Sequence, residues 1–231
     1  MAIPEALAQI HAEIAETCIA CGRAPADVKL MAVSKFHAKE AVAEAYNAGQ
    51  RLFGESRVQE CEAKFSRRSD DFPGAAVHLI GALQRNKVKA AVRLFDCIQS
   101  VDRNELVAEL AKQTAGREQP LEIFLELKTG EDTKSGYRDV EALFGAVEAV
   151  LACPGLRLTG LMTMAPFVGE DIPIRRSFAA LRQAAEKITA RYSEVKITTL
   201  SMGMSGDFKI AIEEGANLIR IGTAIFGERS A

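Results

Sequence analysis

Eight short apolar runs, separated by segments with helical spacing, restrict the fold of this chain more than any other feature. The runs cover residues 29–35, 51–55, 77–82, 95–101, 121–128, 156–164, 197–203 and 217–226. Each is short and predominantly apolar, as expected of a parallel strand that is buried on both faces. The regular alternation of strand and helix predicts parallel pairing through right-handed crossovers.

The segments between the runs predict the helical layer. Helix-forming composition covers residues 39–49, 57–67, 85–93, 105–114, 139–152, 174–192 and 208–215, after a first amphipathic helix over about residues 4–20. Eight βα units in 231 residues predict an α/β fold of the closed (β/α)8 barrel type, with one extra N-terminal helix. An open doubly wound sheet is the alternative, but no Gly-x-Gly-x-x-Gly follows the first run. Since no linker interrupts the pattern, we expect a single domain over residues 1–231.

Composition excludes several classes of partner. The formal net charge of −2 gives no electrostatic footprint for nucleic acid or an anionic membrane, and no apolar stretch reaches transmembrane length. Five scattered cysteines fit free thiols in a reducing compartment, so we expect a cytoplasmic protein. The Cys18-x-x-Cys21 pair lacks the second pair that a zinc site needs, and two thiols on one helical turn explain it better.

Lys35 ends the first apolar run, at the point where a βα unit of a barrel presents its functional groups. Apolar surroundings lower the pKa of an amine and make it a nucleophile toward an aldehyde. The alternative is a strand-end lysine that extends into water, and for an isolated lysine that alternative is favoured. The last two units of the chain reverse this preference.

Two loops rich in glycine and hydroxyl groups follow the seventh and eighth runs. The first covers residues 201–207, and the second covers residues 220–224. In (β/α)8 barrels these loops often hold a phosphate through backbone N–H groups and a helix N-terminus. Ser205 and Thr223 add hydroxyl donors, whereas Asp207 fits an ordinary helix N-cap.

Arg220 lies between Ile219 and Ile221 in the eighth run, so its guanidinium needs a buried partner. A structural ion pair inside the barrel and a bound ligand are both open. An amine, a guanidinium and a phosphate site together favour a ligand with an aldehyde, a ring nitrogen and a phosphate. Pyridoxal 5′-phosphate is such a molecule.

Several stretches carry a family resemblance. They are AVSK (32–35), FGESRVQE (53–60), HLIGALQRNK (78–87), SVDR (100–103), DTKSGY (132–137), GLMTMAP (160–166), LSMGMSGDF (200–208) and AIEEGANLIRIGTAIFGER (211–229). Over about residues 29–229 the chain resembles the pyridoxal phosphate homeostasis protein family. These are single-domain barrels that bind pyridoxal phosphate (PLP) and are similar to the N-terminal domain of alanine racemase.

The resemblance implies roles for individual residues. Lys35 would hold PLP as a Schiff base, and Arg220 would face the pyridine nitrogen. The phosphate set implied is Ser205, Gly222 and Thr223, with Met202 and Gly203 nearby. The chain departs from the family pattern at Ser56, where FGEN has Asn, so one polar contact near the cofactor is shortened or bridged by water. No metal ligands and no catalytic residues are expected.

An arginine beside the pyridine nitrogen disfavours carbanion chemistry, because a group with pKa above roughly 12 keeps its proton and leaves the ring nitrogen neutral. We therefore expect a PLP carrier that maintains cofactor supply, with apo PLP enzymes as recipients, and the family resemblance implies that it is a monomer. Lys134 is a candidate for passing PLP outward. One alternative is a weak PLP-dependent amino-acid racemase, for which Tyr137 is the only candidate second base. Another is a sugar-phosphate enzyme that uses Lys35 as an aldolase-type amine.

Overall fold

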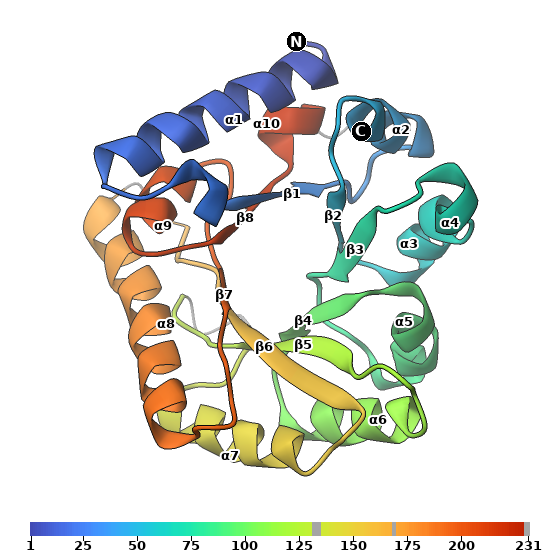
Figure 1. Ribbon diagram of the computed structural model, residues 1–231, viewed down its shortest axis with the longest axis vertical. Helices are drawn as coiled ribbons and strands as arrows, with labels where there is room; N and C mark the ends of the chain where they lie inside the picture. Colours follow the sequence, from blue (N-terminus) through green and yellow to red (C-terminus); the bar gives the residue numbers. More distant parts are fainter. Residues whose placement is uncertain (131–134, 168–169, 229–231) are drawn as a thin grey trace.

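The computed structural model describes residues 1–130, 135–167 and 170–228, and it contains a closed parallel barrel. The strands follow one another around the barrel in chain order, and β1 pairs with both β2 and β8 (Figure 1). Their bounds are β1 Lys29–Val33, β2 Leu52–Glu55, β3 Ala76–Leu79, β4 Cys97–Val101, β5 Leu121–Glu126, β6 Leu156–Met162, β7 Thr199–Ser201 and β8 Leu218–Ile221. The predicted (β/α)8 barrel is confirmed.

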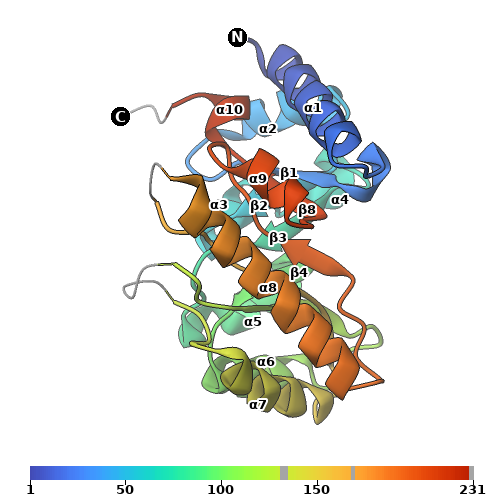
Figure 2. The ribbon, with the colours of Figure 1, turned by 90° about the vertical axis from the view of Figure 1, so that its left-hand side faces the viewer.

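Helices surround the barrel on the outside (Figure 1). They are α1 Ile3–Ala20, α2 Lys39–Asn47, α3 Val58–Phe65, α4 Arg68–Asp71, α5 Val88–Leu94, α6 Asn104–Thr114, α7 Val140–Leu151, α8 Asp171–Arg191, α9 Phe208–Glu213 and α10 Thr223–Phe226, with single 3-10 turns at Pro25–Asp27 and Arg85–Lys87. The extra N-terminal helix α1 packs against α9 and α10. Figure 2 shows α8 crossing the side of the barrel obliquely, between α7 and α9.

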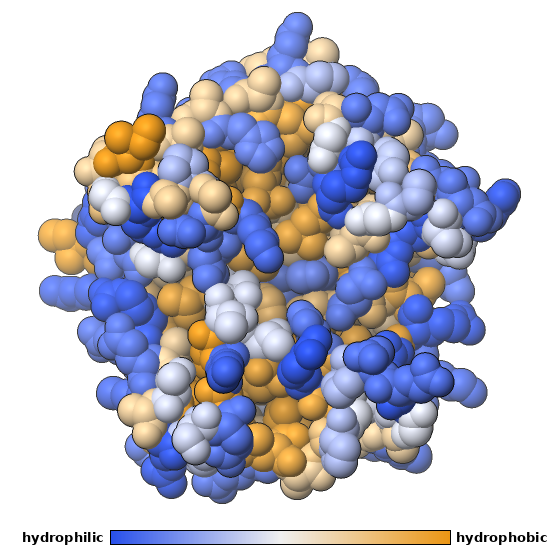
Figure 3. All heavy atoms as spheres, in the orientation of Figure 1, coloured by the Kyte–Doolittle hydropathy of each residue, from blue (hydrophilic) through white to orange (hydrophobic). Residues whose placement is uncertain are grey.

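Alternation along each strand divides the core into two parts. In β1, Leu30 and Ala32 face the helices and join the large outer core, whereas Met31 belongs to a smaller apolar cluster inside the barrel. Gly54 faces the same interior, where a Cβ at its position would lie 2.7 Å from the Met31 sulfur. The interior is therefore packed. In the space-filling view, hydrophilic side chains dominate the outer rim and hydrophobic atoms show mainly between them (Figure 3).

The predicted strand over residues 217–226 is wrong in its second half. β8 ends at Ile221, and α10 begins at Thr223. Gly222 leaves the extended region with φ −114° and ψ −75°, and its carbonyl accepts hydrogen bonds from the N–H groups of Ile225 and Phe226, each at 2.9 Å. These bonds close one helical turn, which an apolar run of this length does not distinguish from a strand.

Other boundaries differ by less. The predicted helix over residues 57–67 is α3 followed by the separate short helix α4, and the helix predicted over 85–93 starts as a 3-10 turn. Across residues 1–130, 135–167 and 170–228, no helix has both the length and the apolar character needed to cross a membrane.

Candidate functional site

A cavity of about 460 Å³ opens at the carboxyl ends of the strands. Among its lining residues, those that sequence analysis had singled out are Lys35, Ser56, Ser205, Arg220, Gly222 and Thr223. They come from the ends of β1, β2, β7 and β8, and Ile80, Met162 and Met164 add apolar walls. The size is within the usual range of small-molecule pockets, roughly 300–1,000 Å³, and the place is the usual one for this fold.

Lys35 reaches this cavity from a turn that follows β1. Its side chain is half-buried. The next residue, Phe36, has φ 68° and is the single non-glycine residue with positive φ in the described part of the chain. Its backbone N–H donates to Glu60 Oε2 at 2.9 Å. The turn thus directs the chain sharply out of the strand and leaves the Lys35 side chain at the mouth of the barrel.

Arg220 is buried in the barrel wall and borders the same cavity. Its Nη1 donates to Ser201 Oγ at 2.8 Å, and its Nη2 donates to the Thr163 carbonyl at 2.8 Å. Burial lowers the pKa of Arg220 to about 10, although Asp207 and Glu126 act in the opposite direction. The structural ion pair considered from the sequence is absent among the described residues, since both acceptors are neutral.

A chain of hydrogen bonds supports Arg220 from inside the barrel. Ser201 Oγ donates to Gln99 Oε1 at 2.6 Å, and the Gln99 amide nitrogen lies 2.8 Å from His78 Nδ1. Since the amide oxygen is already an acceptor, its nitrogen donates to His78. Burial lowers the pKa of His78 to about 4, so the ring is neutral and able to accept that bond. His78 therefore satisfies a hydrogen bond in the core of the barrel.

The loops after β7 and β8 meet at one side of the cavity. Ser205, Gly222 and Thr223 all line it. Met202 is fully buried in the outer core, and neither Met202 nor Gly203 is among the described lining residues. Gly203 has φ 93°, and a Cβ there would lie 2.6 Å from the Ala211 Cβ, so glycine is required for the turn.

The loop that follows β7 ends at α9, where Asp207 occupies the N-cap position. Its side chain makes no cap bond within the helix but turns back, and Oδ1 accepts the Met204 backbone N–H at 2.5 Å. The predicted N-cap position is therefore right, while the expected capping bond is replaced by one that closes the cavity loop.

Glu126 is a buried carboxyl at the end of β5 that sequence analysis missed. Its pKa is raised to about 7, chiefly by burial and also by Asp102, against the opposing effect of Arg220. Ser135 Oγ donates weakly to the carboxylate, at 3.3 and 3.4 Å. The available signal was a charged residue between Leu125 and Leu127 in a strand whose neighbours are apolar.

Gln99 and Ser201 were also missed, although a similar signal was present. Gln99 lies within β4, Ser201 ends the short strand β7, and both polar side chains are fully buried. A polar group at such a position requires a hydrogen-bond partner, and the strand alternation alone does not identify which one.

Tyr137 does not lie in the cavity. Its side chain is buried, and its hydroxyl donates to Asn104 Oδ1 at 2.9 Å. Burial raises the pKa of this phenol. Packing of this residue against the start of α6 accounts for these contacts of Tyr137. Lys134, the candidate for passing PLP outward, lies outside the described residues.

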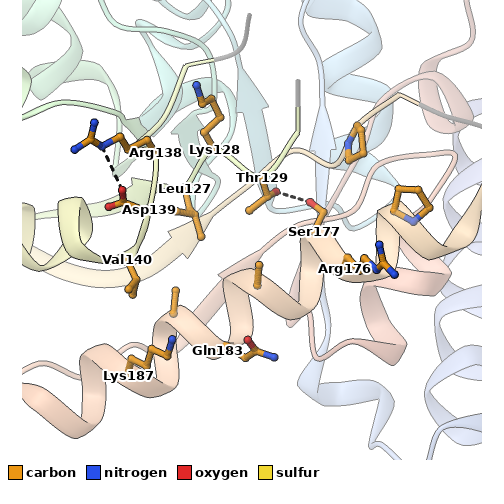
Figure 4. A pocket seen from close by; sticks show the side chains of 14 residues that line it. Leu127, Lys128, Thr129, Arg138, Asp139, Val140, Arg176, Ser177, Gln183 and Lys187 are labelled. Atoms are coloured by element: carbon orange, nitrogen blue, oxygen red, sulfur yellow. Dashed lines mark hydrogen bonds and ion pairs between the residues drawn. The ribbon is translucent and has the colours of Figure 1, made fainter. Parts of the chain in front are cut away.

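A second cavity of about 500 Å³ lies between the end of β5, α7 and α8 (Figure 4). Its lining includes Lys128, Thr129, Arg176 and Ser177, and the two hydroxyls hydrogen-bond to each other across it. None of the residues singled out for the cofactor lines this cavity. Of the two cavities, the one at the strand ends is the candidate site, because it combines the amine, the guanidinium and the loops with hydroxyl groups.

The described residues contain no group of three or more His, Cys, Asp and Glu side chains that could hold a metal ion. All five cysteines are free thiols.

Comparison with known proteins places the chain in context. The family model for the N-terminal domain of alanine racemase matches residues 9–230. The pyridoxal phosphate homeostasis protein of Vibrio cholerae is 39% identical over 230 residues, which cover 98% of this chain and 96% of the relative. The protein of the same name from Escherichia coli is 38% identical over 228 residues, covering 96% and 95%.

Solved structures agree with this picture. PipY of Synechococcus elongatus, determined with PLP bound, has a TM-score of 0.85 and 36% identity and covers 97% of this chain and 100% of that chain. The histidine racemase of Leuconostoc mesenteroides has a TM-score of 0.71 at 19% identity and covers 100% of this chain and 58% of that chain. At that level of identity the racemase shares the fold.

Proposed function

The chain belongs to the family of pyridoxal phosphate homeostasis proteins, and from that premise we propose that it binds PLP in the cavity at the strand ends and serves the intracellular homeostasis of this cofactor. The observation that carries the proposal is the convergence of Lys35, Arg220 and the loops after β7 and β8 on one cavity. The similarity to PipY, which was solved with PLP bound, supports the same ligand.

In this proposal each group has a role that its chemistry allows. The Lys35 amine attacks the aldehyde carbon of PLP, a C=N bond replaces the C=O bond, and water leaves. Ser205 and Thr223 would donate hydroxyl hydrogen bonds to the phosphate, and the backbone N–H groups of Thr223 and Ala224 at the start of α10 would add to them. Gly222 lets the backbone approach the anion. The departure at Ser56 puts a shorter side chain at the rim of this cavity.

Arg220 favours a carrier over an enzyme. With a pKa of about 10 the guanidinium stays protonated at neutral pH, so it can donate to the pyridine nitrogen but does not give up its proton. When bound, PLP normally acts as an electron sink through a protonated ring nitrogen. A neutral ring nitrogen weakens that sink, while the bound state stays intact. We further propose that the carrier is a cytoplasmic monomer that supplies apo PLP enzymes.

The test is the visible absorption of protein titrated with PLP. Wild type should gain an absorption band that borohydride reduction fixes covalently, with the added mass on the peptide that contains Lys35. Lys35→Ala should lose this band, whereas Lys29→Ala, at the exposed start of the same strand, should keep it. Failure of wild type to bind PLP, or retention of the reducible linkage by Lys35→Ala at unchanged affinity, would contradict the proposal.

The racemase alternative makes a separate prediction. It needs a second base near the bound cofactor, and the Tyr137 hydroxyl is engaged with Asn104. We expect holo-protein incubated with single amino-acid enantiomers to leave their optical rotation unchanged over hours. Conversion at a steady rate would support the racemase instead. The aldolase-type alternative predicts colourless protein and a reducible adduct with a keto substrate.

A further inference from the structure

A buried charged cluster lies outside the barrel wall, between the ends of β1 and β2 and helix α3. Glu55 Oε1 accepts hydrogen bonds from Ser34 Oγ and from Lys64 Nζ, both at 2.7 Å. Lys64 Nζ also donates to the Ser34 carbonyl at 2.7 Å. The Glu55 side chain is 0% exposed and that of Lys64 is 8% exposed. Ser34, the residue at the centre of these contacts, immediately precedes Lys35.

The cluster is poorly arranged for stability alone. Taking two charges out of water has a large cost, and apolar side chains of similar volume often stabilise a fold as well or better. In addition, Glu55 Oε2 is buried and has no hydrogen-bond partner among the described residues. Burial raises the pKa of Glu55, against the effect of Lys64. A buried ion pair with one unsatisfied oxygen calls for an explanation in terms of what it holds in place.

What it holds is the turn that carries Lys35. Ser34 is fixed at three points, since its N–H also donates to the Gly54 carbonyl at 3.1 Å. On the other side of Lys35, the Phe36 N–H donates to Glu60 Oε2, which lies 4.0 Å from Lys64 Nζ. The residues before and after Lys35 are therefore both tied to α3 side chains.

Phe36 supplies the reason why such a restraint is needed. Its φ of 68° is in the left-handed region, which costs energy for a bulky side chain and persists only where the surroundings impose it. The turn bends the chain so that Lys35 leaves β1 toward the cavity. If the restraint loosens, the turn can relax and the amine no longer keeps one position.

We propose that Lys64 and Glu55 are positioning residues that preorganise Lys35 for covalent capture of PLP, an inference that rests on the proposed function. Neither side chain lines the cavity, so they act through Ser34 and the Phe36 turn. Their contribution is to hold the Lys35 backbone in the orientation that places the amine at the cavity mouth before the cofactor arrives.

Two variants separate positioning from stability. Lys64→Met removes the ammonium and keeps the length of the side chain. The double variant Lys64→Met with Glu55→Leu replaces the whole pair with apolar groups, and it remains testable if the single variant does not fold. For both, we expect PLP affinity in an absorption titration to fall about tenfold or more, because preorganisation of the reacting group is lost.

A readout on the ligand-free protein is independent of binding. In the double variant, backbone amide exchange at Phe36 and His37 should increase about tenfold or more relative to the barrel strands, because the restraint on the turn is gone. The denaturant midpoint of the double variant should stay close to that of wild type. A purely structural pair would instead lower the midpoint and leave affinity and local exchange unchanged.

Lys39→Met is the control for loss of a lysine–carboxylate pair, because Lys39 pairs with Asp71 at 2.6 Å but its side chain is 42% exposed and makes no hydrogen bond to Ser34 among the described residues. It should bind PLP as wild type does. A double variant that folds and binds PLP with wild-type affinity would overturn the inference. If wild type itself failed to bind PLP, the proposed function would fail first, so the two failures are distinguishable.

Discussion

Arg220 and Lys64 are two buried cations on opposite sides of the same barrel wall, and the protein treats them differently. Arg220, inside the barrel, is held by a hydroxyl and a carbonyl, both neutral. Lys64, outside the barrel, is paired directly with the Glu55 carboxylate. Arg220 borders the cavity, whereas Lys64 does not line it.

This difference in hydrogen-bond partners indicates different roles for the two charges. Neutral acceptors orient the Arg220 guanidinium without neutralising it, and no further hydrogen bond joins it to a residue in the described part of the chain. Its remaining N–H groups are thus available to a ligand. The Lys64 ammonium is neutralised by Glu55, to which it donates one hydrogen bond, and it donates another to the Ser34 carbonyl next to Lys35. In our proposal, Arg220 serves a bound ligand, whereas Lys64 serves the protein's own backbone.

The largest expected effect is a contrast between the same substitution at the two positions. Lys64→Met should lower the free energy of unfolding of the ligand-free protein by about 3–5 kcal/mol, because it leaves the buried Glu55 carboxylate without its counter-charge. Arg220→Met should lower it by only about 1 kcal/mol or less, because the lost hydrogen bonds are offset by removal of a buried charge that no carboxylate of the described residues contacts directly, Asp207 and Glu126 acting from a longer distance. Urea denaturation of both variants measures the difference.

The PLP titration completes that contrast. Arg220→Met, although nearly as stable as wild type, should bind PLP much more weakly, since the cavity loses its guanidinium. Equal destabilisation by the two substitutions would show that the neutral acceptors balance Arg220 as fully as Glu55 balances Lys64, and the comparison would then fail.

The next effect concerns the pH dependence of stability around Arg220. Glu126 has a folded pKa of about 7, against 4.5 for an ordinary glutamate. The folded state therefore binds the Glu126 proton more tightly than the unfolded state. The contribution of this group to the free energy of unfolding is complete below pH 4.5 and is lost as the pH rises through 7. The free energy of unfolding of Glu126→Gln minus that of wild type should therefore increase by about 3 kcal/mol as the pH rises from 4.5 through 7.

His78 should have the opposite sign. Its folded pKa is about 4, against 6.5 for an ordinary histidine, so its contribution is present above pH 6.5 and is lost as the pH falls through 4. The free energy of unfolding of His78→Gln minus that of wild type should therefore decrease by about 3 kcal/mol as the pH rises over that range. Urea midpoints at half-unit pH intervals test both signs. A flat difference for either variant would contradict its assigned environment.

The smallest expected effect is at Tyr137. Tyr137→Phe removes one hydrogen bond to Asn104 and should cost about 1 kcal/mol of unfolding free energy. It should leave PLP affinity unchanged, because the hydroxyl lies outside the cavity lining found among the described residues. A clear loss of affinity would bring Tyr137 into the site and revive the racemase alternative.

The architecture was predictable because its signal is periodic and long. Eight apolar runs in strict alternation with helices leave little choice besides a closed barrel. The error at residues 217–226 arose where periodicity is uninformative, since Thr223–Phe226 is as apolar as the strand before it. Only the backbone at Gly222 decides that a helical turn follows β8.

Several residues that line the candidate site were predictable from the sequence, whereas the residues that hold them in place were not. Lys35 and Arg220 are conspicuous, because each places a charge in an apolar strand or at its end. Gln99 lies 102 residues before Ser201, and their hydrogen bond depends on which strands face each other across the barrel. The contact of Lys64 with Ser34 likewise depends on the packing of α3, which the sequence pattern does not specify.

Closure of the sheet has a consequence for a protein that binds and releases a ligand, as we propose for this one. Each strand from β1 to β8 has a neighbour on both sides, so the barrel offers no bare edge to which another chain could add. Emptying the cavity therefore removes a ligand without exposing a template for aggregation. If the proposed carrier function is right, the ligand-free state would therefore present no sheet edge for pairing with a second copy.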